Sequence, residues 1–233
     1  MPGDYDGDGK ADVALYRPGD GTWQIAQSTG GTMGATWGGG GDRPVPADYD
    51  GDGTFDLAVF RPSTGAWFIR RSSDGATFSV VWGRYSDLPQ PADYDGDGRA
   101  DIAIYRPDTR TFHIIQSTTG GATGVMWGSP RDIPVAADFD GDLRADVAVF
   151  RSSSGTWLVN RTTQGPLTTT WGGPGDIPLP RDYDGDGKAD LAVFRPSTGE
   201  WLIQFSQTGT TTTITLPPPA SGTGADVPVP RRE

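Results

Sequence analysis

The feature that most constrains this sequence is an acidic nine-residue loop that occurs five times. The first copy spans residues 4–12 and has carboxylates at its first, third, fifth and ninth positions. Successive copies start 44 or 45 residues apart, at Asp4, Asp48, Asp93, Asp138 and Asp182. A period of this length leaves room for one supersecondary unit per repeat, so we expect five structural repeats.

The carboxylate spacing suits a hard divalent cation. Calcium takes about 6–8 oxygen ligands in flexible geometry, and a short loop with acidic residues at alternate positions and a Gly at its sharp turn can surround one ion. An ordinary Asp/Gly turn is the alternative, but five copies with the same spacing argue against it. An EF-hand or dockerin loop would need a ligand at a twelfth position and flanking helices, whereas a strand follows the ninth residue here.

The loops also account for the charge of the chain. The formal net charge is −11, and the loops hold twenty of the thirty Asp and Glu residues. Five divalent ions would bring the charge to about −1, so we attribute the acidity to ion binding rather than to a basic partner. No basic stripe indicates nucleic-acid binding. With no Cys and no run of about 18 apolar residues, neither disulfides nor membrane insertion is expected.

Each repeat has the pattern of four short strands. Two prolines at alternate positions in residues 42–47 permit only an edge strand before the acidic loop. After the loop, the apolar and β-branched residues 57–62 predict a strand buried on both faces. A Gly-containing turn leads to a third strand at residues 67–69, and a polar, Thr-rich fourth strand that ends in Trp-Gly is expected to face solvent.

Four antiparallel strands repeated about every 45 residues predict an all-β fold, a five-bladed β-propeller in one domain. The expected repeats are about 4–47, 48–92, 93–137, 138–181 and 182–231. The chain starts after a first strand and ends with a spare one, so residues 226–231 are expected to complete the first blade and close the ring. Leu216 is expected to take the place of the Trp in the last repeat.

The acidic loop, followed at once by a strand such as residues 13–16 in a repeat that ends in Trp-Gly-Gly, resembles the FG-GAP/VCBS repeats of integrin-α-like propellers. The resemblance covers essentially the whole chain. It implies calcium loops between the first and second strands of each blade, in an extracellular or cell-surface protein used in adhesion or ligand binding. The repeat is shorter than an integrin blade and has Trp-Gly in place of Phe-Gly, so no integrin ligand is transferred.

The resemblance and coordination chemistry together imply about five Ca²⁺ ions, one per repeat. The expected carboxylate ligands are Asp4, Asp6, Asp8 and Asp12; Asp48, Asp50, Asp52 and Asp56; Asp93, Asp95, Asp97 and Asp101; Asp138, Asp140, Asp142 and Asp146; and Asp182, Asp184, Asp186 and Asp190. The expected carbonyl ligands are those of Lys10, Thr54, Arg99, Arg144 and Lys188.

One loop departs from the pattern. Leu143 occupies the sixth position, where the other loops have Gly9, Gly53, Gly98 and Gly187. If that position requires a positive φ, a Leu there costs roughly 1–2 kcal/mol. We therefore expect the fourth site to bind calcium more weakly than the others.

Three other sets of residues admit two interpretations. The Arg that ends each second strand could present guanidinium groups to an anionic ligand, but an ion pair with one of the recurrent Asp residues that start the first-strand segments, such as Asp42, is favoured. The Trp residues could stack on sugars, but burial in the core is favoured. His113, the single His, lies within a strand and is expected to pack rather than to catalyse.

The sequence shows no phosphate loop, nucleophile motif or transition-metal cluster, so we expect no enzyme. The predicted function is a calcium-stabilised scaffold or protein-binding adhesion module, with a calcium-dependent lectin as the alternative. The partner would be an unidentified protein or carbohydrate. An extracellular or cell-surface location and a monomer are expected, with a larger ring, or a ring closed by a second chain, left open. The first loop starts at Asp4, which suggests a domain excised from a longer protein.

Overall fold

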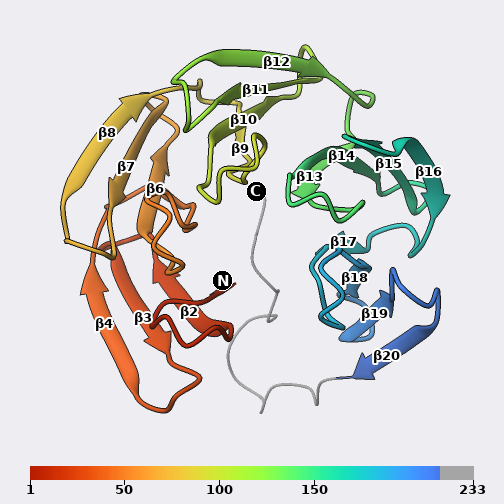
Figure 1. Cartoon of the computed structure of the whole chain (residues 1–233), viewed down its shortest axis with the longest axis horizontal. Coiled ribbons are helices and arrows are strands. Elements are labelled where there is room, and N and C mark those ends of the chain that lie inside the picture. The colour runs from red at the N-terminus through yellow and green to blue at the C-terminus, as the bar shows by residue number, and fades with distance from the viewer. Residues whose placement is uncertain (216–233) are drawn as a thin grey trace. The chain divides into compact units, whose positions relative to one another are not determined.

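The computed structural model describes residues 1–215, which form five four-stranded antiparallel sheets (Figure 1). In each sheet the four strands lie in sequence order. This all-β architecture is that of a five-bladed β-propeller, as the repeats predict. Within residues 1–215 no helix is long and apolar enough to cross a membrane. The predicted closing strand at residues 226–231 and the predicted role of Leu216 lie outside the described residues. The prediction that the chain starts after a first strand was wrong, since β1 (Pro2–Gly3) pairs with β2 (Asp12–Arg17) at the edge of the first sheet.

The first blade contains β1 (Pro2–Gly3), β2 (Asp12–Arg17), β3 (Thr22–Ala26) and β4 (Thr32–Thr36). The second contains β5 (Arg43–Pro44), β6 (Leu57–Arg61), β7 (Ala66–Arg70) and β8 (Thr77–Val81). The third contains β9 (Leu88–Pro89), β10 (Ile102–Arg106), β11 (Thr111–Ile115) and β12 (Ala122–Met126). The fourth contains β13 (Ile133–Ala137), β14 (Asp146–Arg151), β15 (Thr156–Arg161) and β16 (Gly165–Thr170). The fifth contains β17 (Ile177–Pro178), β18 (Leu191–Arg195), β19 (Glu200–Gln204) and β20 (Thr211–Thr215).

The chain divides into two compact units, residues 1–107 with 112–124, and residues 108–111 with the chain from 125 onward. Each unit has buried apolar clusters of its own. In the first, Trp67 and Ile104 belong to one cluster, and Trp23 and Val59 to another. In the second, Trp157 and Val193 share a cluster. Since these pairs join successive blades, packing between blades forms a large part of each core.

The first strand of each blade lies at the sheet edge, because its prolines cannot donate to a second neighbour, and it has two residues in every blade but the fourth, where β13 has five. Pro44 pairs with Val59 in an antiparallel register, and the acidic loop joins these two strands. The second strands β6 and β14 are buried on both faces, as predicted. The fourth strands are the most exposed, which agrees with their Thr-rich sequences.

The second strand of the first blade differs from the prediction. Val13 and Leu15 on β2 are 59% and 58% exposed, whereas the matching Leu57 and Val59 on β6 are buried. Val59 is covered by the preceding blade, since it lies within 3 Å of a Cβ placed on Gly38. Among the described residues of the first unit, no earlier blade precedes β2 to cover this face in the same way.

The Trp residues are structural, as the favoured interpretation predicts. Trp23, Trp67 and Trp157 are fully buried. Trp67 Nε1 donates to the carbonyl of Trp82 at 2.8 Å, and Trp82 Nε1 donates in turn to the carbonyl of His113 in the next blade at 3.0 Å. Because Trp37, Trp127 and Trp171 make the matching contact with the following blade, the Trp-Gly repeat joins neighbouring blades.

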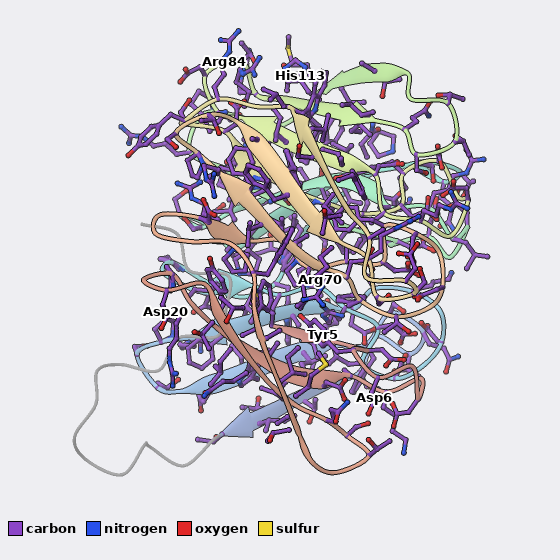
Figure 2. All side chains as sticks on the ribbon, turned by 90° about the vertical axis from the view of Figure 1, so that its left-hand side faces the viewer. Tyr5, Asp6, Asp20, Arg70, Arg84 and His113 are labelled. Atoms are coloured by element: carbon purple, nitrogen blue, oxygen red, sulfur yellow. The ribbon has the colours of Figure 1, made fainter. Side chains whose placement is uncertain are left out.

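The Arg that ends the second strand forms the predicted ion pair in four blades. These pairs are Arg61–Asp42, Arg106–Asp87, Arg151–Asp132 and Arg195–Asp176. Arg17 instead donates to Gln24 Oε1 at 3.2 Å. The pairs lie at the opposite end of the second strand from the acidic loops, just as Asp6 and Asp20 lie at opposite ends of the first blade (Figure 2).

Candidate metal centre

The first Asp of each loop organises the loop backbone. Gly51 N donates to Asp48 Oδ1 at 2.6 Å, and Gly53 N donates to Asp48 Oδ2 at 2.8 Å. The same two bonds recur in the other four loops. Gly51 and Gly53 have φ values of 81° and 87°, which Gly adopts without steric cost. The Asp-Gly spacing therefore encodes a loop that wraps around its own first carboxylate.

Leu143 adopts the same backbone conformation in the fourth loop. Its φ is 67°, and its N–H donates to Asp138 Oδ2 at 2.8 Å, so the loop keeps its path. The condition on which the cost of Leu143 depends, a positive φ at this position, is therefore met. The Leu143 side chain is 76% exposed, so little burial offsets the backbone strain.

Replacing Leu143 by Gly is expected to increase the free energy of unfolding by about 1 kcal/mol, because the left-handed strain of a non-glycine residue exceeds the entropy that Gly adds to the unfolded chain. Urea unfolding measures the change. Leu143→Ala is the matched control, since it shortens the side chain but keeps the Cβ that causes the strain. Equal stabilisation by Ala and Gly would contradict a backbone origin.

The ninth Asp of each loop is buried and ties the loop to the hairpin between the third and fourth strands. Asp56 Oδ2 accepts from Tyr49 N at 2.8 Å, and Asp56 Oδ1 accepts from Ser72 N at 2.7 Å. Asp12, Asp101, Asp146 and Asp190 accept the matching two bonds. This carboxylate therefore satisfies two backbone N–H groups besides any ion that it could bind.

The third Asp presents a buried oxygen that lacks a protein partner. Asp140 is 5% exposed, and its Oδ2 accepts from Thr163 Oγ1 at 2.7 Å and from Thr163 N at 2.9 Å. Its Oδ1 is buried with no hydrogen-bond partner, and so are the Oδ1 atoms of Asp50 and Asp95. A buried carboxylate oxygen without a donor is costly, so each of these atoms indicates a place for a cation.

Three carboxylates converge in every loop, with one oxygen of each lying within 4.8 Å of the others. In four loops they are the first, third and ninth residues: Asp48, Asp50 and Asp56; Asp93, Asp95 and Asp101; Asp138, Asp140 and Asp146; and Asp182, Asp184 and Asp190. In the first loop they are Asp4, Asp6 and Asp8. The structure thus brings together three of the four predicted carboxylates in each loop.

The fifth Asp is held differently. Asp52 Oδ1 accepts from Thr54 N at 2.7 Å, and Asp52 Oδ2 accepts from Ser72 Oγ at 2.9 Å. The fifth residues of the next three loops, Asp97, Asp142 and Asp186, likewise accept from a backbone N–H and from a Ser or Thr hydroxyl. These fifth residues lie outside the converging sets, and in the first loop it is the ninth residue, Asp12, that lies outside. The carbonyls of Lys10, Thr54, Arg99, Arg144 and Lys188 stay predicted ligands.

A pair of hydroxyl residues that was not predicted completes each of the first four loops, and in the fifth loop Ser206 is followed by Gln207 instead of a second hydroxyl residue. Ser28 Oγ donates to Asp8 Oδ2 across 20 residues, and Thr29 Oγ1 donates to Asp6 Oδ2 across 23 residues. The same separations recur for Ser72 and Ser73, Ser117 and Thr118, and Thr162 and Thr163. This constant separation within the repeat is the signal that could have found them.

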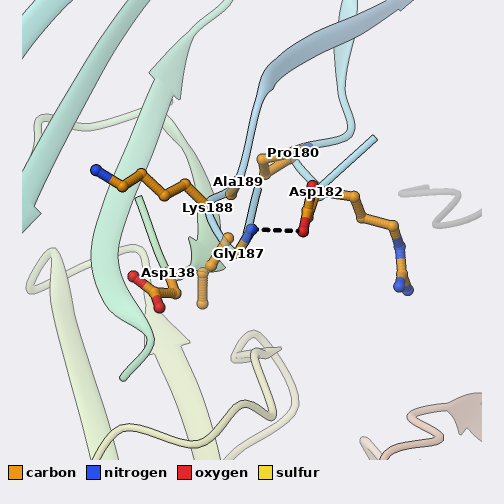
Figure 3. Close-up of a pocket in the computed structure, with 9 residues that line it drawn as sticks. Asp138, Pro180, Asp182, Gly187, Lys188 and Ala189 are labelled. Atoms are coloured by element: carbon orange, nitrogen blue, oxygen red, sulfur yellow. Dashed lines mark hydrogen bonds between the residues drawn. The ribbon is translucent and has the colours of Figure 1, made fainter. Parts of the chain in front are cut away.

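Neighbouring loops of one unit are bonded to one another. Ala100 N donates to the carbonyl of Asp48 at 2.6 Å, and the pairs Phe55–Asp4 and Ala189–Asp138 repeat this bond. A pocket of about 300 Å³ opens beside the fourth and fifth loops, with Asp138, Asp182 and Lys188 among its lining residues (Figure 3). The dashed bond in Figure 3, from Gly187 N to Asp182 Oδ2 at 2.9 Å, belongs to the loop itself.

The environment shifts the acidity of several carboxyls. Burial raises the pKa of Asp56, Asp101 and Asp146, and their backbone hydrogen bonds only partly offset this effect. Burial also raises the pKa of Asp184, with Asp190 the next contribution. The hydroxyl of Ser28 lowers the pKa of Asp8. Burial would raise the pKa of Asp140 as well, but the bonds from Thr163 and Gln164 outweigh it and lower that pKa.

Comparison with solved structures supports the fold. Virginiamycin B lyase from Staphylococcus aureus aligns with a TM-score of 0.59 at 10% identity, over 94% of this chain and 71% of the lyase. An Agrocybe aegerita lectin specific for non-reducing terminal N-acetylglucosamine aligns with a TM-score of 0.59 at 20% identity, over 92% of this chain and 65% of the lectin. BBS1N, solved in complex with ARL6DN, aligns with a TM-score of 0.51 at 14% identity, over 94% of this chain and 66% of BBS1N. The chain has the β-propeller fold. No protein-family model and no curated protein sequence matches it.

These similarities correct one prediction. The sequence analysis expected no enzyme, but the propellers similar to this chain include a lyase. The fold that this chain shares therefore supports catalysis in at least one relative of similar architecture, and the exclusion of an enzyme was wrong. At 10% identity the likeness extends to the fold alone, and no lyase residue is transferred to this sequence.

Proposed function

We propose that this chain is a calcium-binding repeat propeller in which each acidic loop binds one Ca²⁺ and thereby stabilises its blade. The observation that carries the proposal is the unpartnered, buried Oδ1 of Asp140, repeated in Asp50 and Asp95, inside clusters of three carboxylates. The donor set consists of oxygen alone, which suits calcium, and the irregular loop suits its flexible coordination better than the octahedral geometry of magnesium.

We further propose that the calcium-stiffened propeller acts as a scaffold or binding module of a secreted or cell-surface protein. The loops occupy one end of the blades and leave the other end and the outer strands free for a partner, either a protein or a carbohydrate. The lectin alternative required Trp side chains that stack on sugars. Trp23, Trp67 and Trp157 are buried and the Trp-Gly indoles bond to neighbouring blades, so the Trp residues do not supply such platforms.

Calorimetric titration of the chelator-treated chain with CaCl₂, together with native mass spectrometry, tests calcium binding. The expected stoichiometry is about five ions. Asp140→Asn is expected to remove about one ion, because it replaces a charged ligand by a neutral group of the same shape. The matched control is Asp108→Asn, an exposed Asp outside the loops, which is expected to leave five. No calcium uptake, or an unchanged count in Asp140→Asn, would contradict the proposal.

Calcium affinity is expected to fall as the pH is lowered. A carboxyl must lose its proton to bind the ion, and burial raises the pKa of Asp56, Asp101 and Asp146 above 3.8. Because the pKa of these carboxyls is higher in the folded state than in the unfolded state, the folded protein binds protons at a higher pH than the unfolded chain does. As the pH falls through the folded-state pKa, protons compete with calcium for these carboxylates. We expect affinity to weaken roughly tenfold or more between about pH 7 and about pH 4.5. Calorimetry at both pH values measures this, and equal affinities would contradict the assignment.

A further inference from the structure

Residues at matching positions of the five repeats can be compared directly. At the boundary between the second and third blades, three positions carry residue types that the other repeats lack. The connection after the fourth strand carries Arg84 and Tyr85 here, and strand β11 carries His113. The residues matching Arg84 are Gly39, Ser129 and Gly173, and those matching Tyr85 are Gly40, Pro130 and Pro174. The residues matching His113 are Gln24, Phe68, Leu158 and Leu202. Packing of the fold does not require Arg, Tyr or His at these positions, since the other blades form without them.

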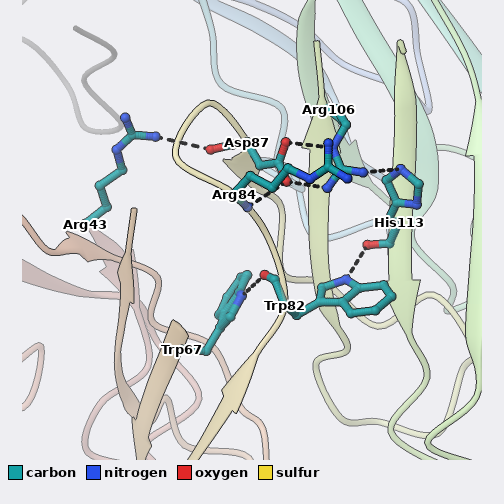
Figure 4. Close-up of polar contacts among 7 residues, drawn as sticks. All are labelled: Arg43, Trp67, Trp82, Arg84, Asp87, Arg106 and His113. Carbon is teal, nitrogen blue, oxygen red and sulfur yellow. Dashed lines mark hydrogen bonds and ion pairs between the residues drawn. The ribbon is translucent and has the colours of Figure 1, made fainter. Parts of the chain in front are cut away.

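Two of the departures, Arg84 and His113, lie close together (Figure 4). Trp82 Nε1 donates to the carbonyl of His113 at 3.0 Å, and the two rings lie edge to face with centroids 6.5 Å apart. Two residues after Trp82, Arg84 N donates to Asp87 Oδ2 at 2.9 Å. Arg84 and His113 lie at the same corner of the first unit in both views (Figures 2 and 4). Residues separated by almost thirty positions in the sequence therefore form one local cluster.

The cluster carries more positive than negative charge. Arg106 forms a two-point ion pair with Asp87, with Nε to Oδ1 at 3.0 Å and Nη2 to Oδ2 at 2.8 Å. Arg43 Nη1 donates to the carbonyl of Asp87 at 3.3 Å. Of the three Arg residues around Asp87, only Arg106 binds the carboxylate through its guanidinium, whereas Arg43 donates to the backbone carbonyl and Arg84 donates through its backbone N–H. This excess stands out in a chain with a net charge of −11.

His113 adds a directed donor. Arg106 Nη1 lies 3.4 Å from His113 Nε2, and since a guanidinium can only donate, Nε2 accepts and the proton of the neutral ring resides on Nδ1. Burial lowers the pKa of His113, and the positive charges of Arg106 and Arg84 lower it further. The negative charge of Asp87 raises this pKa, but its effect is smaller than that of burial or of Arg106. The imidazole is therefore neutral near pH 7 and carries its N–H at Nδ1.

We propose that Arg84 and His113, beside the Arg106–Asp87 ion pair, form a binding site for an oxyanion, a carboxylate or sulfate group of a ligand whose carbon skeleton packs on Tyr85. The Arg84 guanidinium supplies donors and charge of the right sign for such a group, and the imidazole N–H supplies a further donor. The Tyr85 ring is 76% exposed and directly follows Arg84, so it can cover an apolar or saccharide face of the same ligand. The site lies at the Arg end of β10, away from the acidic loop before this strand, and does not depend on calcium.

The single His makes the proposal directly measurable. In the calcium-supplemented chain, the ring signals of His113 are followed by NMR during addition of sodium sulfate or sodium glucuronate, with sodium chloride at equal ionic strength as the reference. A saturable shift with glucuronate is expected. If sulfate shifts the signal as well, the oxyanion alone suffices for binding; if only glucuronate does, the contact with Tyr85 is required. No shift beyond that of chloride overturns the proposal, and a shift with sulfate alone overturns the role of Tyr85.

The other repeats provide variants compatible with the fold. Arg84→Gly, which installs the residue of two matching positions, is expected to weaken binding about tenfold or more through the loss of a charged donor. His113→Leu, followed by calorimetry, is expected to weaken it as well. Arg70→Gln is the control, since Arg70 is exposed and lies toward the acidic-loop end of β7. Wild-type affinity in Arg84→Gly, or an equal loss in Arg70→Gln, would overturn the assignment. Five bound calcium ions in Arg84→Gly would show that a loss of oxyanion binding leaves the proposed metal sites intact.

Discussion

Treatment with excess EDTA is expected to lower the melting temperature of this chain by roughly 20 °C or more. At a calcium concentration about 100 times Kd, each site adds roughly 2.7 kcal/mol to the folded state, and the melting temperature of a chain of this size moves by about 2–4 °C per kcal/mol. Without the cation, three carboxylates held within 4.8 Å of one another repel in each loop. Differential scanning calorimetry in calcium and in EDTA measures the shift.

The hydrogen bonds between loops add to this expectation. Since Ala100 N binds the carbonyl of Asp48 and Ala189 N binds that of Asp138, a loop that loses its ion disturbs the loop of the next blade in the same unit. Adding calcium back in excess over EDTA is the control and should restore the original melting temperature. Magnesium at the same concentration should restore much less. An identical melt with and without chelator would overturn calcium as a structural element.

Replacing Asp56 by Ala is expected to lower the free energy of unfolding by roughly 3 kcal/mol even in EDTA, because it leaves one buried and one partly buried N–H group without an acceptor. These are the N–H groups of Tyr49 and Ser72, which join the loop to the hairpin between β7 and β8. The effect is thus separate from the loss of an ion. Urea unfolding in EDTA measures the change.

The matched controls for Asp56→Ala are two other acidic residues of the same blade. Asp74 forms an exposed ion pair with Arg71, so Asp74→Ala is expected to change stability by no more than about 0.5 kcal/mol. Asp50→Ala removes the carboxylate whose Oδ1 has no protein partner and should cost little in EDTA but remove one calcium ion. A loss in Asp56→Ala that appears only in calcium would show that the ninth Asp acts through the ion alone.

Much of the fold was predictable because the sequence repeats itself. Prolines before each loop placed the first strand at the sheet edge, and the run from Leu57 to Arg61 predicted a buried second strand. The recurrence of Arg61 and Asp42 at constant spacing predicted their ion pair. The β2 strand was predicted less well, because exposure of Val13 and Leu15 depends on which neighbour lies beside the blade rather than on the strand itself.

The candidate metal centre was predictable in its residues but not in its geometry. Alternate carboxylates in residues 48–56 identified the loop, and the positive φ of Leu143 followed from the Gly at the same place in other loops. Which carboxylates converge did not follow. Asp52 binds Ser72 and lies outside the converging set of its loop, whereas Asp8 binds Ser28 in the same way and belongs to the converging set of the first loop.

The sequence by itself determined five repeats, four strands in each and a loop built around its first Asp, because backbone conformation at Gly, Pro and β-branched residues depends on local sterics. Only the tertiary structure decided which oxygens meet, which of them lack a partner, and that Arg84 and His113 lie at one corner. Side-chain direction depends on the register of hairpins and on the packing of successive blades, and these bring together residues that local sterics leave unrelated.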